Sequence, residues 1–468
     1  MKSKILYISL VMVLAMSLAV GAIGCADGGD PSNDTVVIGM SRSITGGLST
    51  IHNAAFGPIY KIYTDMVNDP GYGGIDIDGT KFPMAYVEKN DNSEDSKLIA
   101  HTLDLISDVA AGDVHTIFGP TCTRMIDVMA PYCNNNDCVL LTAEGGATFL
   151  EEPGYLPDWP YVFINLSFSD WCQLQCLAPL LSDAHGNHTT YVNNATAFIY
   201  WQNDAHGEEY LASAEAMFPP YITILGDESV LDITSGNPTD YDYMSAIDLA
   251  YTAYNGNPVD IVCCFCYPAE VIGLTVAAIA KNYNFNAWVG GPGANFGFYG
   301  LAMQANAEDV MCFAIANNKT SADMKWLFDT MIMPNMDGVG GYPGFYYLDW
   351  WGQPLYWAAL QVWEEAIGEV GVVTAGPPAT FVVSQVDLKN ELHSYDGSPG
   401  SVPTILGDTY YDFFGTGGGI LSCDCHTGEI GQWQTDTNPY CSLYVEIVGC
   451  TNETASINYP KTSWAGFP

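Results

Sequence analysis

From Thr35 onward, short runs of hydrophobic residues alternate with longer segments in which apolar residues recur with the period of a helix. The short runs are rich in Val, Ile and Phe and predict buried strands, and the longer segments predict helices. The predicted strands of this first series are 36–40, 82–88, 114–118 and 139–141, and the predicted helices are 55–67, 96–109 and 124–133. Regular alternation of this kind predicts a parallel sheet covered by helices on both faces.

A second series of the same kind follows the Pro- and aromatic-rich stretch 153–160. Its predicted strands are 197–201, 221–225, 261–266 and 287–289, and its helices are 208–218, 241–254 and 269–282. One more strand at 310–316, a short helix at 322–331 and a long amphipathic helix at 354–370 follow, and the tail from Thr380 predicts strands and turns. The predicted fold class is therefore α/β, with two Rossmann-like lobes built from parallel sheets flanked by helices.

The N-terminal segment has the layout of an export signal. Lys2 and Lys4 precede an uncharged apolar stretch, and Ala22-Ile23-Gly24 leads to Cys25. This order predicts a signal peptide with a lipobox-like end over 1–25, lipidation at Cys25 and a flexible polar tether over 26–34. An uncleaved N-terminal anchor is the alternative, because the apolar stretch is near the lower limit for spanning a bilayer. In either case we expect an exported protein, at the cell surface or on the periplasmic side of the cytoplasmic membrane.

The composition limits the possible partners and the redox chemistry. With 53 acidic and 13 basic residues the formal charge is −40, and such a surface repels nucleic acid, which is excluded as a partner. Removing Cys25 from 14 cysteines leaves an odd number, so at least one is free, metal-bound or paired with another chain. Two pairs are close enough in sequence for local disulfides, Cys133 with Cys138 and Cys441 with Cys450. No second ligand pair accompanies Cys423-Asp424-Cys425-His426, so we predict no metal and no cofactor.

Several short strings occur in an order that carries a family resemblance. They are Val37-Ile38-Gly39 with Ser43-Ile44-Thr45-Gly46, Ile117-Phe118-Gly119-Pro120, Pro160-Tyr161-Val162-Phe163, Ala205-His206-Gly207 and Tyr267-Pro268-Ala269-Glu270. Together they resemble the branched-chain amino-acid (Leu/Ile/Val) binding protein family, the type I periplasmic substrate-binding proteins of ABC transporters. The resemblance covers residues 35–316, continues at 357–360 and is weak in the last hundred residues.

This resemblance implies two lobes joined by three crossing strands, with a small-molecule ligand in the cleft, a permease as partner and a monomeric protein. The crossings are expected near residues 161–168, 310–317 and 379–386. Lobe 1 would then comprise 35–163 plus 317–376, and lobe 2 would comprise 164–316 plus 377–468.

Loops that leave the carboxyl ends of parallel strands converge with helix N-termini, whose unpaired N–H groups suit carboxylates and other acceptors. Thr121, Cys122 and Thr123 lie between a predicted strand and a predicted helix, although Thr121 or Thr123 alternatively serves as the N-cap. The resemblance adds Ser43, Thr45 and Pro292, and it places His206 where the family commonly has a tyrosine over the ligand, with Tyr267 in the corresponding place after its own strand. The strand ending at residue 141 contributes Thr142, Ala143, Glu144 and Gly146.

Two departures from the family pattern bear on the ligand. Amino-acid binders carry an acidic residue after the strand that corresponds to 287–289, but residues 290–295 contain no carboxylate. A buried ammonium without an anion costs several kcal/mol, so an α-amino acid requires Glu144 as a substitute. Amides, ureas and carboxylates without an amine are the alternatives. The only two arginines, Arg42 and Arg124, are candidate anion contacts, with internal pairing to Asp127 or another neighbour as the alternative.

Three other classes of function are an enzyme, a sensory receptor module and a structural glycoprotein. No nucleophile elbow, P-loop, His-Glu-x-x-His or paired-carboxylate motif is present in the sequence, which argues against an enzyme. A ligand-sensing receptor module uses the same fold, and a surface structural glycoprotein would explain the charge and the Asn-x-Ser/Thr triplets. The sequence favours an extracytoplasmic solute-binding lipoprotein of an ABC-type uptake system, with an amino acid, amide, urea or carboxylate as ligand.

Overall fold

The computed structural model describes residues 34–142, 159–164, 174–186, 195–230, 241–374, 376, 378–397, 400–413, 419–423, 429–437, 442–449 and 453–466. The chain folds into two compact units, with divisions after Ser167, Trp351 and Cys425. The amino-terminal unit combines the described residues up to Ile164 with those from Gly352 to Cys423. The carboxyl-terminal unit combines the described residues from Leu174 to Trp351 with those from Glu429 to Gly466. Predictions for the signal peptide, the tether to residue 33 and Cys25 lie outside the described residues.

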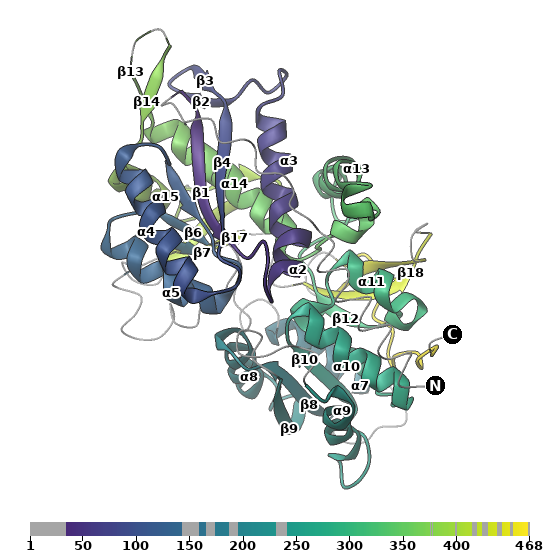
Figure 1. Cartoon of the computed structure of the whole chain (residues 1–468). Helices are drawn as coiled ribbons and strands as arrows, with labels where there is room; N and C mark the ends of the chain where they lie inside the picture. The colour runs from purple at the N-terminus through teal and green to yellow at the C-terminus, as the bar shows by residue number, and fades with distance from the viewer. Residues whose placement is uncertain are drawn as a thin grey trace. The chain divides into compact units, whose positions relative to one another are not determined.

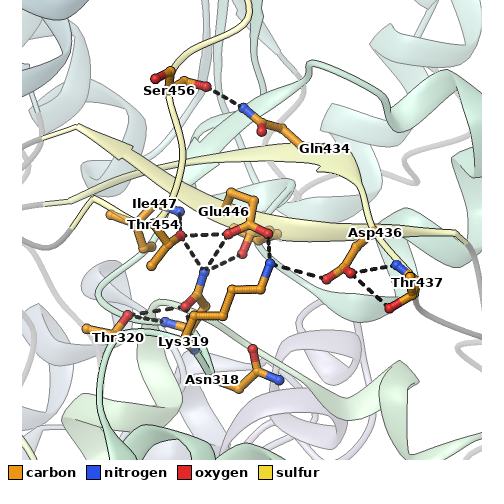
Figure 2. Close-up of polar contacts among 12 residues, drawn as sticks. Asn318, Lys319, Thr320, Gln434, Asp436, Thr437, Glu446, Ile447, Thr454 and Ser456 are labelled. Atoms are coloured by element: carbon orange, nitrogen blue, oxygen red, sulfur yellow. Dashed lines mark hydrogen bonds and ion pairs between the residues drawn. The ribbon is translucent and has the colours of Figure 1, made fainter.

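The second and third divisions lie later in the chain than the crossings expected near 310–317 and 379–386. Residues 317–351 stay in the carboxyl-terminal unit because their first loop is bonded to its last strand. Asn317 Nδ2 donates to Val445 O at 3.0 Å, and Lys319 forms an ion pair with Glu446 (Figure 2). The hydrophobic pattern predicts the strand before this loop and the helix after it, but it contains no trace of these long-range contacts.

The amino-terminal unit is built on an eight-stranded sheet with the order β15-β16-β17-β7-β6-β5-β1-β4. Its neighbouring strands from β17 to β4 are parallel, and β15 and β16 join antiparallel at the edge. The bounds are β1 (Val36–Arg42), β4 (Met84–Asn90), β5 (Thr116–Phe118), β6 (Leu140–Thr142), β7 (Val162–Ile164), β15 (Val402–Thr404), β16 (Gly407–Phe413) and β17 (Gly419–Cys423).

Helices cover both faces of this sheet (Figure 1). Side-chain alternation along the strands assigns the faces: Phe118 of β5 packs its ring against Tyr60 and Trp363. Gly39 of β1, which pairs with the neighbouring residue of β5, instead lies against Leu105. One face therefore carries α3 (Gly57–Val67) and α14 (Gly352–Val370), and the other carries α4 (Asp95–Ala111), which packs on α5 (Thr123–Asn135). Before α3 the chain forms α2 (Ser49–Ile51) and the π-helical segment η1 (His52–Phe56). Two antiparallel strand pairs lie outside the main sheet. They are β2 (Ile75–Ile77) with β3 (Thr80–Phe82), and β13 (Val372–Thr374) with β14 (Thr380–Val382).

The carboxyl-terminal unit is built on a seven-stranded sheet with the order β19-β18-β12-β11-β10-β8-β9. In this order, the neighbouring strands from β12 to β9 pair in parallel. At the other edge, β18 pairs antiparallel with both β12 and β19. Its strands are β8 (Ala195–Gln202), β9 (Ile222–Val230), β10 (Ile261–Phe265), β11 (Ala287–Val289), β12 (Met311–Phe313), β18 (Ile430–Thr435) and β19 (Leu443–Gly449). Its helices are α7 (Gln175–Gly186), α8 (Ala205–Met217), α9 (Tyr243–Thr252), α10 (Pro268–Lys281), α11 (Gly297–Met303), α12 (Ala322–Lys325) with the π-helical η7 (Trp326–Ile332), and α13 (Met333–Met336). Short 3-10 turns are η5 (Gly291–Gly293), η6 (Gln304–Ala307), η8 (Val339–Gly341) and η9 (Gly344–Tyr347).

The predicted fold class is confirmed, because two mostly parallel sheets flanked by helices form from the predicted strand and helix series. One element of the tail was missed: α15 (Gln385–Ser394) lies where strands and turns were expected. Ser384 caps this helix, its side chain accepting from Asp387 N at 3.3 Å, which is a local signal visible in the sequence. Within the described residues, no helix combines the length and apolar character needed to cross a membrane.

Candidate functional site

In the amino-terminal unit, a buried carboxylate ties together two loops at the carboxyl ends of neighbouring strands. Asp91 directly follows β4, and it accepts hydrogen bonds from Ser43 Oγ at 2.7 Å, Ser93 N at 2.8 Å and Ser41 Oγ at 3.3 Å. Burial raises the pKa of Asp91 above its ordinary value, although these hydrogen bonds oppose the rise. The loop after β1 is thereby fixed against the loop after β4.

The predicted residues Ser43 and Thr121 meet in the same cluster. Ser43 N donates to Thr121 Oγ1 at 2.9 Å, and both residues are fully buried. The N-cap of α5 is Cys122, which makes no capping hydrogen bond with its side chain, and Thr123 is the first helical residue. The alternative in which Thr121 or Thr123 caps the helix is therefore wrong, because the Thr121 hydroxyl is used to join loops. Thr45 is exposed, and its Oγ1 donates to Asn92 Oδ1 at 2.7 Å.

Arg42 is fully buried at the end of β1, with 0% of its surface exposed. Its Nη1 donates to Pro120 O at 2.6 Å, its Nη2 donates to Tyr60 OH at 2.8 Å, and its guanidinium lies 4.5 Å from the centre of the Phe56 ring. These contacts hold the loop after β5 against α3. Arg42 is an internal cation in this structure, and its positive charge acts on the nearby acidic groups.

Glu88 of β4 lies near this cation and contacts His52 Nε2 at 3.4 Å. Burial raises the pKa of Glu88 to about 7, although the Arg42 charge opposes the rise. Burial and the Arg42 charge together lower the pKa of His52 to about 3. At neutral pH the imidazole is uncharged, so the contact between His52 and Glu88 is not an ion pair.

Two further predicted residues of this unit differ in their surroundings. Arg124 Nη1 forms an ion pair with Asp95 at the start of α4, which is the kind of internal pairing given above as the alternative to an anion contact. Thr142 ends β6 fully buried, and its hydroxyl has no hydrogen-bond partner within the described parts of the chain. The predictions for Ala143, Glu144 and Gly146 lie outside the described residues.

In the carboxyl-terminal unit, the predicted residues His206 and Tyr267 are in contact. Their rings stack with 5.0 Å between centroids and 14° between planes, and Tyr210 meets His206 edge-on at 4.9 Å. Burial lowers the pKa of His206 to about 3, so it is a neutral imidazole, and its Nε2 has no partner among the residues described here. Asp204 caps α8, its Oδ1 accepting from His206 N at 3.1 Å.

Glu270 lies in the first turn of α10, three residues after Tyr267, and has 0% of its surface exposed. Neither carboxyl oxygen has a hydrogen-bond partner in another residue of the described chain. Burial raises the pKa of Glu270 to about 8, its own backbone N–H opposes the rise, and the Asp204 carboxylate adds to it. Pro292, predicted from the resemblance, is buried in η5 after β11 and has a neighbour, Gly291, with a positive φ of 48°.

Of the two suggested disulfides, only the pair Cys133 and Cys138 lies within the described residues. Cys133 and Cys138 are free thiols, so the suggested bridge between them is wrong for this structure. Cys138 N donates to Cys133 O at 3.0 Å across the end of α5, and Cys138 Sγ lies 3.5 Å from Asn136 O. Cys176 is disulfide-bonded, whereas the suggested pair Cys441 and Cys450 lies outside the described residues.

Two carboxylates on which the clusters depend, Asp91 and Glu270, were not predicted as site residues from the sequence. For Asp91 the available signal was the polar run Asn90-Asp91-Asn92-Ser93 directly after a predicted strand. For Glu270 it was an acidic residue in the first turn of a helix that is otherwise apolar. Neither signal discloses whether the carboxylate has partners.

No protein-family model and no curated protein matches the sequence. Solved structures match it in fold along nearly the whole chain. The LivJ branched-chain amino acid transporter substrate binding protein from Streptococcus pneumoniae, in complex with isoleucine, has a TM-score of 0.62 at 16% identity, over 89% of this chain and 100% of that one. The leucine binding protein LivK from Thermotoga maritima has a TM-score of 0.59 at 12% identity, over 88% of this chain and 97% of that one.

A third structure with the same architecture binds a different kind of molecule. The solute binding protein of an ABC transporter from Rhodopseudomonas palustris, in complex with 3,4-dihydroxy benzoic acid, has a TM-score of 0.62 at 13% identity, over 90% of this chain and 98% of that one. This chain has the type I periplasmic-binding fold. The predicted resemblance is confirmed at the level of the fold. Because the type I neighbours include amino-acid and aromatic-acid binders, the fold does not fix the ligand.

Proposed function

We propose that the protein is the extracytoplasmic solute-binding component of an ABC-type uptake system, which binds a small polar molecule between its two units. The type I fold supports this proposal, since the neighbours described above are named as substrate-binding or solute-binding proteins of transporters. Such neighbours carry solutes without transforming them, which agrees with a function in transport.

The observation that carries the proposal is a set of buried, unpartnered polar atoms at the carboxyl ends of strands. Thr142 is the last residue of β6 in one unit, and His206 and Glu270 follow β8 and β10 in the other. Most buried polar groups in folded proteins are hydrogen-bonded, so unsatisfied groups need an explanation. A polar solute that donates and accepts hydrogen bonds at these positions supplies one.

A thermal-shift screen tests this function. Amino acids, amides, ureas and short carboxylates are added one class at a time to the purified protein. A ligand at a hundredfold excess over its dissociation constant should stabilise the fold by about 2.7 kcal/mol. Solution scattering with the best compound should then show a smaller particle, because binding closes two-unit proteins of this fold. If no compound raises the melting temperature, the transport function is refuted.

A ligand-sensing receptor is the second candidate, since one neighbour from Rhodopseudomonas palustris is named an extracellular ligand-binding receptor. Deletion of the gene separates the two functions. Loss of uptake of the identified solute supports transport, and unchanged uptake with a lost response to the solute supports sensing.

We also propose that the protein is anchored through lipid on Cys25. This is supported by the order of basic, apolar and small residues before that cysteine. The Cys25→Ala variant should leave the membrane fraction, and mass spectrometry of the wild-type N-terminus should find an acylated cysteine. An unmodified, uncleaved N-terminus would establish the anchor-helix alternative instead.

A further inference from the structure

Glu270 occupies the position at which a glutamate commonly stabilises the start of a helix. Tyr267 is the N-cap of α10, so Glu270 is its third helical residue, where a capping-box glutamate bonds the N-cap N–H. Here Tyr267 N instead donates to Gln202 Oε1 at 3.3 Å. The capping role is therefore filled by another side chain, and it does not explain the Glu270 carboxyl group.

Among the residues that the structure describes, no cationic side chain acts on Glu270. The described groups that act on it electrostatically are the Asp204 carboxylate, the Tyr243 hydroxyl and the Cys266 thiol, which are acidic or neutral. Tyr243 OH is itself buried without a partner in the described chain. An ionised carboxylate in such a place is strongly destabilised unless a positive group approaches it.

A second unpartnered side chain lies in the same part of the unit. His206 is 6% exposed at the start of α8, its ring stacks on Tyr267 at 5.0 Å, and its Nε2 is open within the described chain. Gly207 follows it and allows α8 to start closely against β8, since a Cβ there would lie 1.9 Å from Gln202 O. Two adjacent helix starts thus present a carboxyl group, a neutral imidazole and an aromatic pair.

We propose that Glu270 is the acidic contact for the ligand, and that the transported solute carries a cationic nitrogen, as an ammonium, amidinium or guanidinium group. This inference rests on the proposed solute-binding function and names the class of solute. Residues 290–295 contain no carboxylate, and in this proposal Glu270, in the first turn of α10, takes the role of the missing one. His206 Nε2 is then free to bond a second polar group of the same solute.

Binding of a cation to Glu270 should release a proton, and this release can be measured. Without a ligand the carboxyl group is mostly protonated at pH 7, because its pKa is about 8. When a cation pairs with the carboxylate, the proton passes to the buffer, since the ammonium of the solute is already protonated. Close to one proton should be released per solute bound at this pH.

The experiment uses matched compounds that differ in one amino group, L-leucine with 4-methylpentanoate and L-phenylalanine with 3-phenylpropanoate, together with agmatine, putrescine, acetamide and urea. Isothermal titration calorimetry at pH 7 in phosphate and in Tris reports affinity and proton release. We expect binders among the cationic compounds only, with proton release in the wild type.

Glu270→Gln should weaken binding by about 30-fold or more and abolish proton release, because a buried charge pair loses one partner. Glu270→Met fills the same space without a polar group, and it should show the same weaker binding and the same loss of proton release. It is a second test of the proposal in case Glu270→Gln does not fold. Glu215→Gln removes the same charge from an exposed site on α8 and should bind as the wild type does.

The outcomes separate the inference from the proposed function. Absence of binding by every compound refutes the solute-binding function. Tight binding of the deaminated partners, full affinity of Glu270→Gln, or wild-type binding without proton release overturns the role of Glu270 and leaves the solute-binding function in place.

Discussion

Two glutamates of the carboxyl-terminal unit are almost equally buried, but they lie in opposite surroundings. Glu446 of β19 is 5% exposed and is surrounded by donors: it pairs with Lys319, and its Oε2 accepts from Thr454 Oγ1 at 2.7 Å (Figure 2). The same oxygen accepts from Asn317 Nδ2 at 3.4 Å. Glu270 is 0% exposed and accepts from no other described residue.

The difference separates a group that stabilises the fold from one that is available for binding. The contacts of Glu446 fasten the loop after β12 to the last strand, so its burial is compensated by charge and hydrogen bonds. Glu270 has no such compensation from the residues that the structure describes, and conflicts of this kind between local chemistry and stability are expected at functional sites. Four predictions test this contrast.

The largest effect is expected from Glu270→Gln as a function of pH. The folded-state pKa of about 8 lies above the ordinary value of 4.5, so between these values the unfolded chain loses the proton while the folded protein keeps it. The wild type therefore loses stability as pH rises through this window, and the variant lacks this loss. The difference in unfolding free energy should change by roughly 3–4 kcal/mol between pH 4.5 and 8, measured by urea denaturation. A difference that is constant with pH would contradict an unpaired Glu270.

Glu446→Ala should lower the unfolding free energy by about 2–3 kcal/mol at pH 7, since it leaves the Thr454 hydroxyl without its acceptor, removes the partner of Lys319 and takes one of three acceptors from the Asn317 amide. Urea denaturation measures the loss, and solute affinity should be unchanged. If Glu446→Ala were as stable as the wild type, the network in Figure 2 would not contribute to the fold.

Lys319→Met should cost about 1 kcal/mol or less, because the lysine side chain is 46% exposed and water screens its charge. Raising the salt concentration should narrow the gap between the variant and the wild type. A loss as large as that of Glu446→Ala would mean that the ion pair, and not the hydrogen bonds, dominates the network.

Thr142→Val should have the smallest effect on stability, within about 0.5 kcal/mol, because it replaces a buried hydroxyl that has no described partner. Thermal unfolding without ligand measures this directly, with Thr121→Val as a matched control. The Thr121 hydroxyl accepts from Ser43 N, so its loss should cost about 1–2 kcal/mol. Equal costs for the two variants would show that Thr142 has a structural role after all.

Much of the fold could be predicted because it depends on local order in the chain. Apolar runs and helix-period segments placed β1, α4, β10 and α10 within a few residues of their observed bounds. Helix α15 was missed although Ser384 and Asp387 gave its capping signal, because the surrounding Gly-, Asp- and Tyr-rich tail favoured turns. The positions of the candidate site residues at strand ends were predictable for the same reason as the strands themselves.

The sequence by itself determined the α/β class, the order of strands and helices, and the polar residues available where strands end, since these follow from hydrophobic period and residue chemistry. Tertiary structure alone decided which of those polar residues have hydrogen-bond or ion-pair partners. Ser43 and Asp91 meet across 48 positions, Lys319 and Glu446 across 127, and Glu270 meets no donor from another described residue. The physical reason is that the cost of a buried polar group depends on its spatial neighbours, and these are set by how the chain packs.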